Sequence, residues 1–218
     1  MSKFYFVRHG ESEANTLHII ANRDHGYGLT PRGQQQAQTL AAKLQPIAPA
    51  AIFTSPLCRA VETAAILSQV LGPPYQITDA LREYDCGVLE GRSDPQSWQL
   101  HQEIAEDWLV HCHWERRPEQ GESFLDIKHR FLPFIDQCTQ AASFQDEPMI
   151  FVGHGGLFKL MLPLVLVNID VPFVTCHPIS HTDCIIAELQ PRGMRCLQWG
   201  STRRHWSDAI PSTPWAVT

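Results

Sequence analysis

Two apolar runs in this sequence each lead into a histidine. Phe4 to Val7 is followed by Arg8 and His9, and Met149 to Val152 is followed by a glycine and His154. Runs of this kind are typical of buried strands, whose carboxyl ends face the ligand crevice of open α/β sheets. An arginine offers forked donors to an oxyanion, and a neutral imidazole can act as a nucleophile. The two segments therefore predict an anion site that contains a candidate nucleophile.

Glycines next to both histidines let the backbone come close to a bound group. Gly10 follows His9, and Gly155 and Gly156 follow His154 just before a helix that we expect from about Leu157. A strand, a glycine turn and a helix N-terminus form an anion site, because unpaired N–H groups point outward there. The N–H of Gly155 is therefore a further candidate donor.

A third strand end carries another arginine. Ala51 to Thr54 predicts a short buried strand, and Ser55-Pro56 ends it just before Arg59, in a helix expected from about Leu57 to Leu71. An arginine in a helix is usually solvated. A second arginine placed after a strand nevertheless favours a shared anion site.

The sequence also contains a candidate proton donor. Leu81-Arg82-Glu83-Tyr84-Asp85-Cys86-Gly87 follows an edge-like strand expected at Tyr75 to Thr78. The residue types alone do not separate Glu83 from its neighbours Asp85 and Glu90.

Taken together, these motifs resemble the histidine phosphatase superfamily, the phosphoglycerate mutase-like proteins. The resemblance is carried, in chain order, by Arg8-His9-Gly10-Glu11, Leu29-Thr30-x-x-Gly33-x-x-Gln36-Ala37, Ser55-Pro56-Leu57-x-Arg59-Ala60-x-x-Thr63-Ala64, Leu81-Arg82-Glu83, Gly121-Glu122-Ser123 and Gly153-His154-Gly155-Gly156. Several motifs in the same order make chance agreement improbable.

The resemblance implies a role for each motif residue. His9 would carry a phosphohistidine intermediate, and Glu83 would protonate the leaving group and then activate water. The implied catalytic residues are His9, Glu83, Arg8, Arg59 and His154, and the implied phosphate ligands are Arg8, Asn15, Arg59, His154 and Gly155. The family chemistry uses no metal ion and no cofactor. The expected substrate is a small phosphorylated metabolite.

Mutase and phosphatase activities would use the same residues. Mutases of the family carry a Phe-Thr-Gly-Trp segment where this chain has Ile19 to Arg23, and their interval between Glu83 and His154 is typically longer. Both departures favour a phosphatase. A phosphoglycerate mutase and a fructose-2,6-bisphosphatase-like activity remain alternatives. A catalytically silent binding module is disfavoured because the whole catalytic set is present.

Length and pattern predict one domain over residues 1–218. The chain has 218 residues, 44% of them hydrophobic, which is enough for one α/β core. Alternating strands and helices predict a three-layer, doubly wound, mostly parallel sheet with helices on both faces. We expect a helical insert at about 92–120 over the carboxyl end of the sheet, with its helix reaching His113, and a loosely structured tail at about 203–218.

The remaining elements follow from local patterns. Thr30-Pro31 predicts the start of a helix whose apolar face includes Ala37 and Leu44, and Ser123 precedes another amphipathic helix. Asn168 to Pro178 predicts a loop or short connection. His181 to Leu189 and Arg195 to Trp199 predict an antiparallel pair of strands at a sheet edge. The pattern gives no role to Thr182 or Asp183.

Charge and cysteine content limit the partners. The net charge of −6 argues against nucleic acid and anionic membranes. Seven widely spaced cysteines and the absence of signal-peptide features predict a cytoplasmic protein with reduced thiols. His101, His111 and His113 are interpreted as surface histidines rather than metal ligands, and Arg116-Arg117 as a solvated pair. A homodimer is compatible with the sequence.

Overall fold

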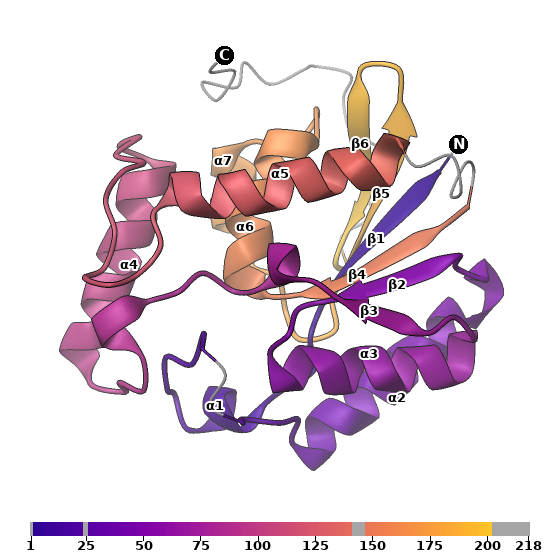
Figure 1. The fold of residues 1–218 in the computed structure, drawn as a ribbon, viewed down its shortest axis with the longest axis horizontal. Helices are drawn as coiled ribbons and strands as arrows, with labels where there is room; N and C mark the ends of the chain where they lie inside the picture. Colours follow the sequence, from indigo (N-terminus) through magenta and orange to yellow (C-terminus); the bar gives the residue numbers. More distant parts are fainter. Residues whose placement is uncertain (1, 24–25, 141–146, 202–218) are drawn as a thin grey trace.

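The computed structural model describes residues 2–23, 26–140 and 147–201, and in this part of the chain six strands form one sheet in the order β3-β2-β4-β1-β5-β6 (Figure 1). The strands are β1 (Lys3–Arg8), β2 (Ala51–Thr54), β3 (Tyr75–Ile77), β4 (Met149–Gly153), β5 (Cys184–Gln190) and β6 (Gly193–Trp199). The first four run parallel, whereas β5 is antiparallel to both β1 and β6. This confirms the predicted mostly parallel sheet with an antiparallel pair at one edge.

Helices cover both faces of the sheet (Figure 1). They are α1 (Glu13–Thr16), α2 (Pro31–Leu44), α3 (Cys58–Leu71), α4 (Pro95–Leu109), α5 (Phe124–Gln140), α6 (Gly155–Val165) and α7 (Val171–Cys176), with 3₁₀ turns at Gln45–Ile47, Asp79–Leu81 and Gly87–Leu89. Side chains of β1 alternate between the faces: Tyr5 and Val7 pack with α2 and α3, whereas Phe4 and Phe6 pack with residues of α4 to α7. The strand is apolar throughout because both of its faces are buried.

Local signals start the helices where the sequence predicts. Thr30 caps α2, since its hydroxyl accepts a hydrogen bond from the Gly33 N–H at 3.0 Å, and Pro31 occupies the first turn. Gly33 itself must be glycine, because an added Cβ would lie 2.0 Å from the Glu11 carbonyl oxygen. That close approach packs the start of α2 against the loop after β1. Helix α2 thus helps to fix the segment that carries His9.

One predicted helix end and one predicted loop differ from the structure in this part of the chain. Helix α4 ends at Leu109 instead of reaching His113, and the chain turns away at Cys112, whose φ is 56°. The segment 168–178, predicted as a loop, contains α7. This helix begins because the Asp170 carboxylate accepts a hydrogen bond from the Phe173 N–H at 2.8 Å and Pro172 stands in its first turn.

The helical insert is in the predicted place. Helix α4 lies beyond the carboxyl ends of the parallel strands (Figure 1). The tail expected at 203–218 lies outside the described residues. None of the helices in the described ranges combines the length and apolarity that crossing a lipid bilayer requires.

Candidate active site

Sheet register brings the two predicted histidines together. Arg8 at the end of β1 pairs with Gly153 at the end of β4, so His9 and His154 follow at adjacent strand ends. The His9 N–H also donates to the Gly153 carbonyl at 3.0 Å. As a result, the two imidazole centroids lie 5.1 Å apart, although the residues are distant in sequence.

Hydrogen bonds define which nitrogen of His9 carries the proton. Nδ1 lies 2.6 Å from the Gly10 carbonyl oxygen, which only accepts, so Nδ1 is the protonated nitrogen. Nε2 accepts a hydrogen bond from Nε of Arg59 at 3.1 Å and therefore holds a lone pair. Burial, reinforced by Arg59 and Arg8, lowers the pKa of His9 well below its usual value. The ring is neutral at physiological pH.

His154 lies next to His9 and is almost completely buried, with 1% of its surface exposed. Its Nε2 is 2.7 Å from the hydroxyl of Ser55, the residue that follows β2. Nδ1 is buried and has no hydrogen-bond partner in the described part of the chain. Burial first, and then the charge of Arg59, lowers the pKa of His154 well below its usual value.

The two predicted arginines reach the same place from different elements. Arg8 donates through Nη1 to the Ile179 carbonyl at 2.6 Å, while its Nε is buried without a partner among the described residues. Arg59 lies in the first turn of α3 and is 6% exposed, and burial lowers its pKa to about 10. Both guanidinium groups therefore remain cationic at neutral pH.

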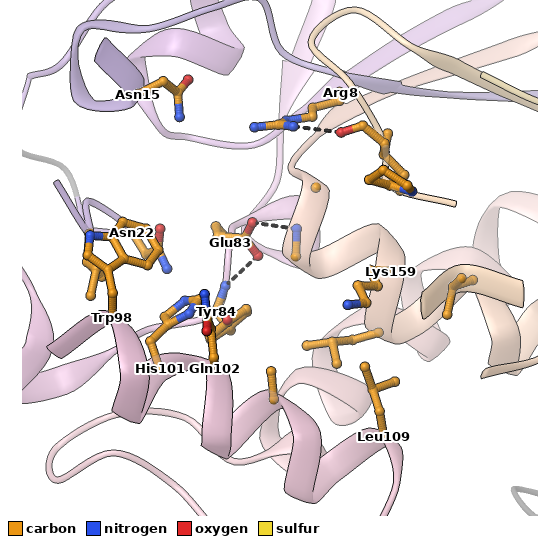
Figure 2. A pocket seen from close by; sticks show the side chains of 18 of the residues that line it. Arg8, Asn15, Asn22, Glu83, Tyr84, Trp98, His101, Gln102, Leu109 and Lys159 are labelled. Atoms are coloured by element: carbon orange, nitrogen blue, oxygen red, sulfur yellow. Dashed lines mark hydrogen bonds between the residues drawn. The ribbon is translucent and has the colours of Figure 1, made fainter. Parts of the chain in front are cut away.

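Glu83 is the buried acid of the site. Its Oε2 accepts a hydrogen bond from the Gly156 N–H of α6 at 2.9 Å, and its Oε1 accepts from the Tyr84 N–H at 3.2 Å (Figure 2). Burial raises the pKa of Glu83, although these N–H groups and Arg59 act in the opposite direction. The carboxyl group thus holds its proton more firmly than a solvated glutamate does.

The two competing acids have other partners. Asp85 forms an ion pair with Arg23 at 3.0 Å and accepts from the Gly87 N–H. Glu90 accepts from the backbone N–H groups of Asn22 and Cys86. Both carboxylates hold loops together and neither lines the cavity described next.

Most of the predicted site residues face a cavity of about 600 Å³. Its lining includes six of the seven predicted site residues: Arg8, His9, Asn15, Arg59, Glu83 and Gly155. His154, which is almost completely buried, is not among the lining residues. The Asn15 Oδ1 accepts hydrogen bonds from the backbone and hydroxyl of Ser12 at 3.1 and 2.8 Å. This leaves the amide nitrogen of Asn15 directed toward the cavity (Figure 2).

The sequence reasoning missed His181. Its Nε2 lies 3.1 Å from Nη2 of Arg8 and 3.0 Å from Oδ1 of Asn15. Burial and the charge of Arg8 lower its pKa to about 4, so His181 is neutral. Its Nε2 can then either accept from Arg8 or donate to Asn15, according to the tautomer. The segment containing it was predicted as a strand, but β5 begins only at Cys184, and no local pattern marks the turn before it.

Other charged candidates lie away from the cavity. Arg116 pairs with the buried Asp107, and Arg117 pairs with Asp126 at 3.0 Å, so the two arginines are ion-paired rather than merely solvated. His113 also contacts Asp107, at 3.1 Å. Within the described ranges, no group of three or more His, Cys, Asp or Glu side chains is arranged to hold a metal ion.

Comparison with known proteins identifies the family of this chain. The sequence profile of the histidine phosphatase superfamily (branch 1) matches residues 4–202. The chain belongs to this superfamily. It is 30% identical over 165 residues to "Putative phosphoserine phosphatase 2" of Hydrogenobacter thermophilus, covering 76% of this chain and 79% of the relative. It is also 32% identical over 172 residues to "Probable phosphoglycerate mutase GpmB" of Escherichia fergusonii, covering 76% and 75%.

The fold of this histidine phosphatase superfamily member also matches solved structures. A mycobacterial glucosyl-3-phosphoglycerate phosphatase in complex with VO3 superposes with a TM-score of 0.78 at 22% identity, covering 92% of this chain and 99% of the other. At that identity the likeness shows the fold alone. The predicted family and α/β architecture are confirmed.

Proposed function

We propose that this protein is a metal-independent, cytoplasmic phosphatase that hydrolyses a small phosphorylated metabolite through a phosphohistidine on His9. The observation that carries the proposal is the state of His9: Nδ1 is held by the Gly10 carbonyl at 2.6 Å, and the lone pair on Nε2 lies beside the Arg59 guanidinium. Neutral imidazole with a fixed tautomer is the form that can attack phosphorus.

The surrounding cations suit a phosphoryl group. Arg8 and Arg59 can stabilise the charge that spreads over the equatorial oxygens of the transferring group. The amide of Asn15, the buried Nδ1 of His154 and the Gly155 N–H at the start of α6 would add donors. A phosphate oxygen would replace His9 Nε2 as the acceptor for Arg59, which frees the lone pair for attack.

Glu83 would supply the proton that the leaving alcohol needs. Its raised pKa suits an acid, and Gly156 holds its carboxyl at the same helix end that would bind the phosphate. After transfer, the ionised Glu83 would take a proton from the water that attacks the phosphohistidine. The phosphate then leaves, and His9 returns as neutral imidazole.

Hydrolysis is favoured over mutase action by the sequence around Ile19 to Arg23, which departs from the family mutases. A phosphoglycerate mutase activity and a fructose-2,6-bisphosphatase-like activity are the alternatives, and a silent binding module is a weaker one. A mutase would pass the phosphoryl group to a second hydroxyl instead of water, so phosphate release with and without a bisphosphoglycerate primer separates the two activities.

The deciding experiment uses 4-nitrophenyl phosphate in the presence of EDTA. We expect phosphate release, inhibition by orthovanadate, and acid-labile labelling of the protein by a phosphorylated substrate that is lost in His9→Ala. The control is His113→Ala, a histidine whose ring contacts Asp107 away from the cavity. Loss of activity on chelation, or unchanged labelling in His9→Ala, would contradict the mechanism.

A further inference from the structure

The cavity continues well past its phosphate end and follows one face of α4. Trp98, His101, Ala105 and Leu109 line it and recur every three or four residues, so they form a continuous wall along this helix. Figure 2 shows this wall facing Lys159 of α6 across the space below Glu83. Whatever alcohol carries the phosphate must lie against this wall.

The facing walls are also apolar. Ile20 lies in the segment after α1, Leu160 in α6 and Val174 in α7, and Ile179 follows α7. All four line the cavity, yet each is at most 6% exposed. Apolar side chains that are packed this firmly provide a preformed surface for hydrocarbon rather than a hydrated cleft.

Several polar groups in this part of the cavity are already hydrogen-bonded within the protein, whereas Gln102 and Glu106 line its exposed rim on α4. The indole N–H of Trp98 donates to the His18 carbonyl at 2.8 Å, and the Tyr84 hydroxyl lies 2.6 Å from Nε2 of His101. The Asn22 amide nitrogen donates to the Cys86 sulfur at 3.1 Å. These buried groups are therefore not available to the hydroxyl groups of a sugar, which would lose hydrogen bonds to water without replacement along this wall.

Beyond the phosphate end, the cavity lining has little positive charge and includes the exposed carboxylate of Glu106. Apart from Arg8 and Arg59, Lys159 is the one lysine or arginine among the described lining residues. His101 also lines the cavity, but burial lowers its pKa to about 4, so it adds no positive charge at neutral pH. A bisphosphate would bring a second doubly charged group to a single lysine. This part of the cavity is better matched to an uncharged body.

We infer that the substrate is a phosphate monoester of a bulky, mostly apolar alcohol, held by the α4 wall, rather than a sugar phosphate or bisphosphate. The inference rests on the proposed phosphatase function for its catalytic step. Its recognition step can be measured without catalysis, because alkylphosphonates have a P–C bond that the enzyme cannot hydrolyse.

The test is calorimetric binding of ethyl-, butyl- and hexylphosphonate to the full-length protein. A fully buried methylene contributes about fourfold in affinity. We therefore expect hexylphosphonate to bind at least tenfold more tightly than ethylphosphonate, and 3,4-dihydroxybutylphosphonate, of similar size, to bind at least tenfold more weakly than hexylphosphonate. Equal affinity along the alkyl series, or tight binding of the dihydroxy compound, would overturn the inference.

Matched variants on α4 locate the effect. Ala105→Asn puts a polar group into the wall, whereas Leu100→Asn makes the same kind of change at a 37% exposed position that does not line the cavity. Hexylphosphonate affinity should fall at least fivefold in Ala105→Asn and stay unchanged in Leu100→Asn, while ethylphosphonate affinity changes in neither. A fall of equal size in both variants, or no fall in Ala105→Asn, would remove the α4 wall from the site.

Binding and turnover measurements test the two proposals separately, so one proposal can fail while the other stands. Hydrolysis of 4-nitrophenyl phosphate with no preference for long alkyl chains would leave the phosphatase proposal standing and refute the inferred substrate class. Chain-length-dependent binding without hydrolysis of any ester would refute the phosphatase proposal and retain the ligand class.

Discussion

Replacing Gly156 by alanine should damage proton donation while leaving the phosphate ligands intact. An added Cβ would lie 2.8 Å from both carboxylate oxygens of Glu83 and 2.7 Å from Cε1 of Tyr84, whereas ordinary contact begins at 3.4 Å. Because Tyr84 is buried among core residues, the carboxyl group must give way, by roughly half an ångström. Misplacement by about 1 Å costs about a hundredfold in rate, so we expect about a tenfold loss.

The assay compares two leaving groups. Ethanol needs a proton from Glu83 as it leaves, whereas 4-nitrophenolate leaves without one. Gly156→Ala should therefore lower kcat/KM about tenfold for ethyl phosphate and less than threefold for 4-nitrophenyl phosphate.

Gly155→Ala is the matched control. Its Cβ would lie 3.3 Å from Nε of Arg8, so any loss should be the same for both esters. Equal losses in Gly156→Ala, or no loss, would refute the assignment of Glu83 as the acid. Thermal melts of both variants check folding, since alanine adds up to about 1 kcal/mol of helix propensity.

Three further outcomes are expected. Burial raises the pKa of Glu83 above its usual 4.5, so the ionised carboxylate destabilises the folded protein as pH rises. Glu83→Gln should therefore raise the unfolding free energy, measured by urea titration. The gain should grow above pH 4.5 and become constant above the pKa that Glu83 has in the folded protein. The pKa values of His9 and His154 are lowered in the folded protein, so below about pH 6.5 the unfolded chain binds more protons than the folded protein does. The unfolding free energy should therefore fall with decreasing pH, by up to about 2.7 kcal/mol per pH unit for the two histidines together. The fall should be smaller in the double variant His9→Phe/His154→Phe. The alkaline limb of kcat/KM for ethyl phosphate reports deprotonation of Glu83 and should disappear in Glu83→Gln.

Strand ends were predictable from sequence because they depend on short-range pattern. Phe4 to Val7 is apolar at every position since side chains pack on both faces of β1, and the same holds for Met149 to Val152 in β4. Parallel strands then bring their carboxyl ends to one edge of the sheet. What the pattern could not supply is the order of the strands, which inserts β4 between β2 and β1 and sets His154 beside His9.

The sequence predictions were wrong where an element is too short to show a periodicity, or where its conformation depends on contacts with residues far away in the sequence. Helix α7 has only six residues, too few for a helical periodicity to be distinct, although Asp170 and Pro172 are a start signal. The position of His181 depends on a turn in which Thr182 has a φ of 59° and donates its N–H to the Arg8 carbonyl at 3.1 Å. That turn exists only once β5 has paired with β1, so its cause lies far away in the sequence.

The choice of Glu83 over its neighbours shows what the folded structure adds. Three acids stand within eight residues, and composition treats Glu83, Asp85 and Glu90 alike. Their partners distinguish them: Asp85 pairs with a cation, whereas Glu83 is held by the first turn of α6. Consecutive glycines in that turn lie against different functional side chains: Gly155 lies against Arg8, and Gly156 lies against Glu83. Phosphate binding and proton donation should therefore be separable by substitutions one residue apart, even though both depend on the same helix end.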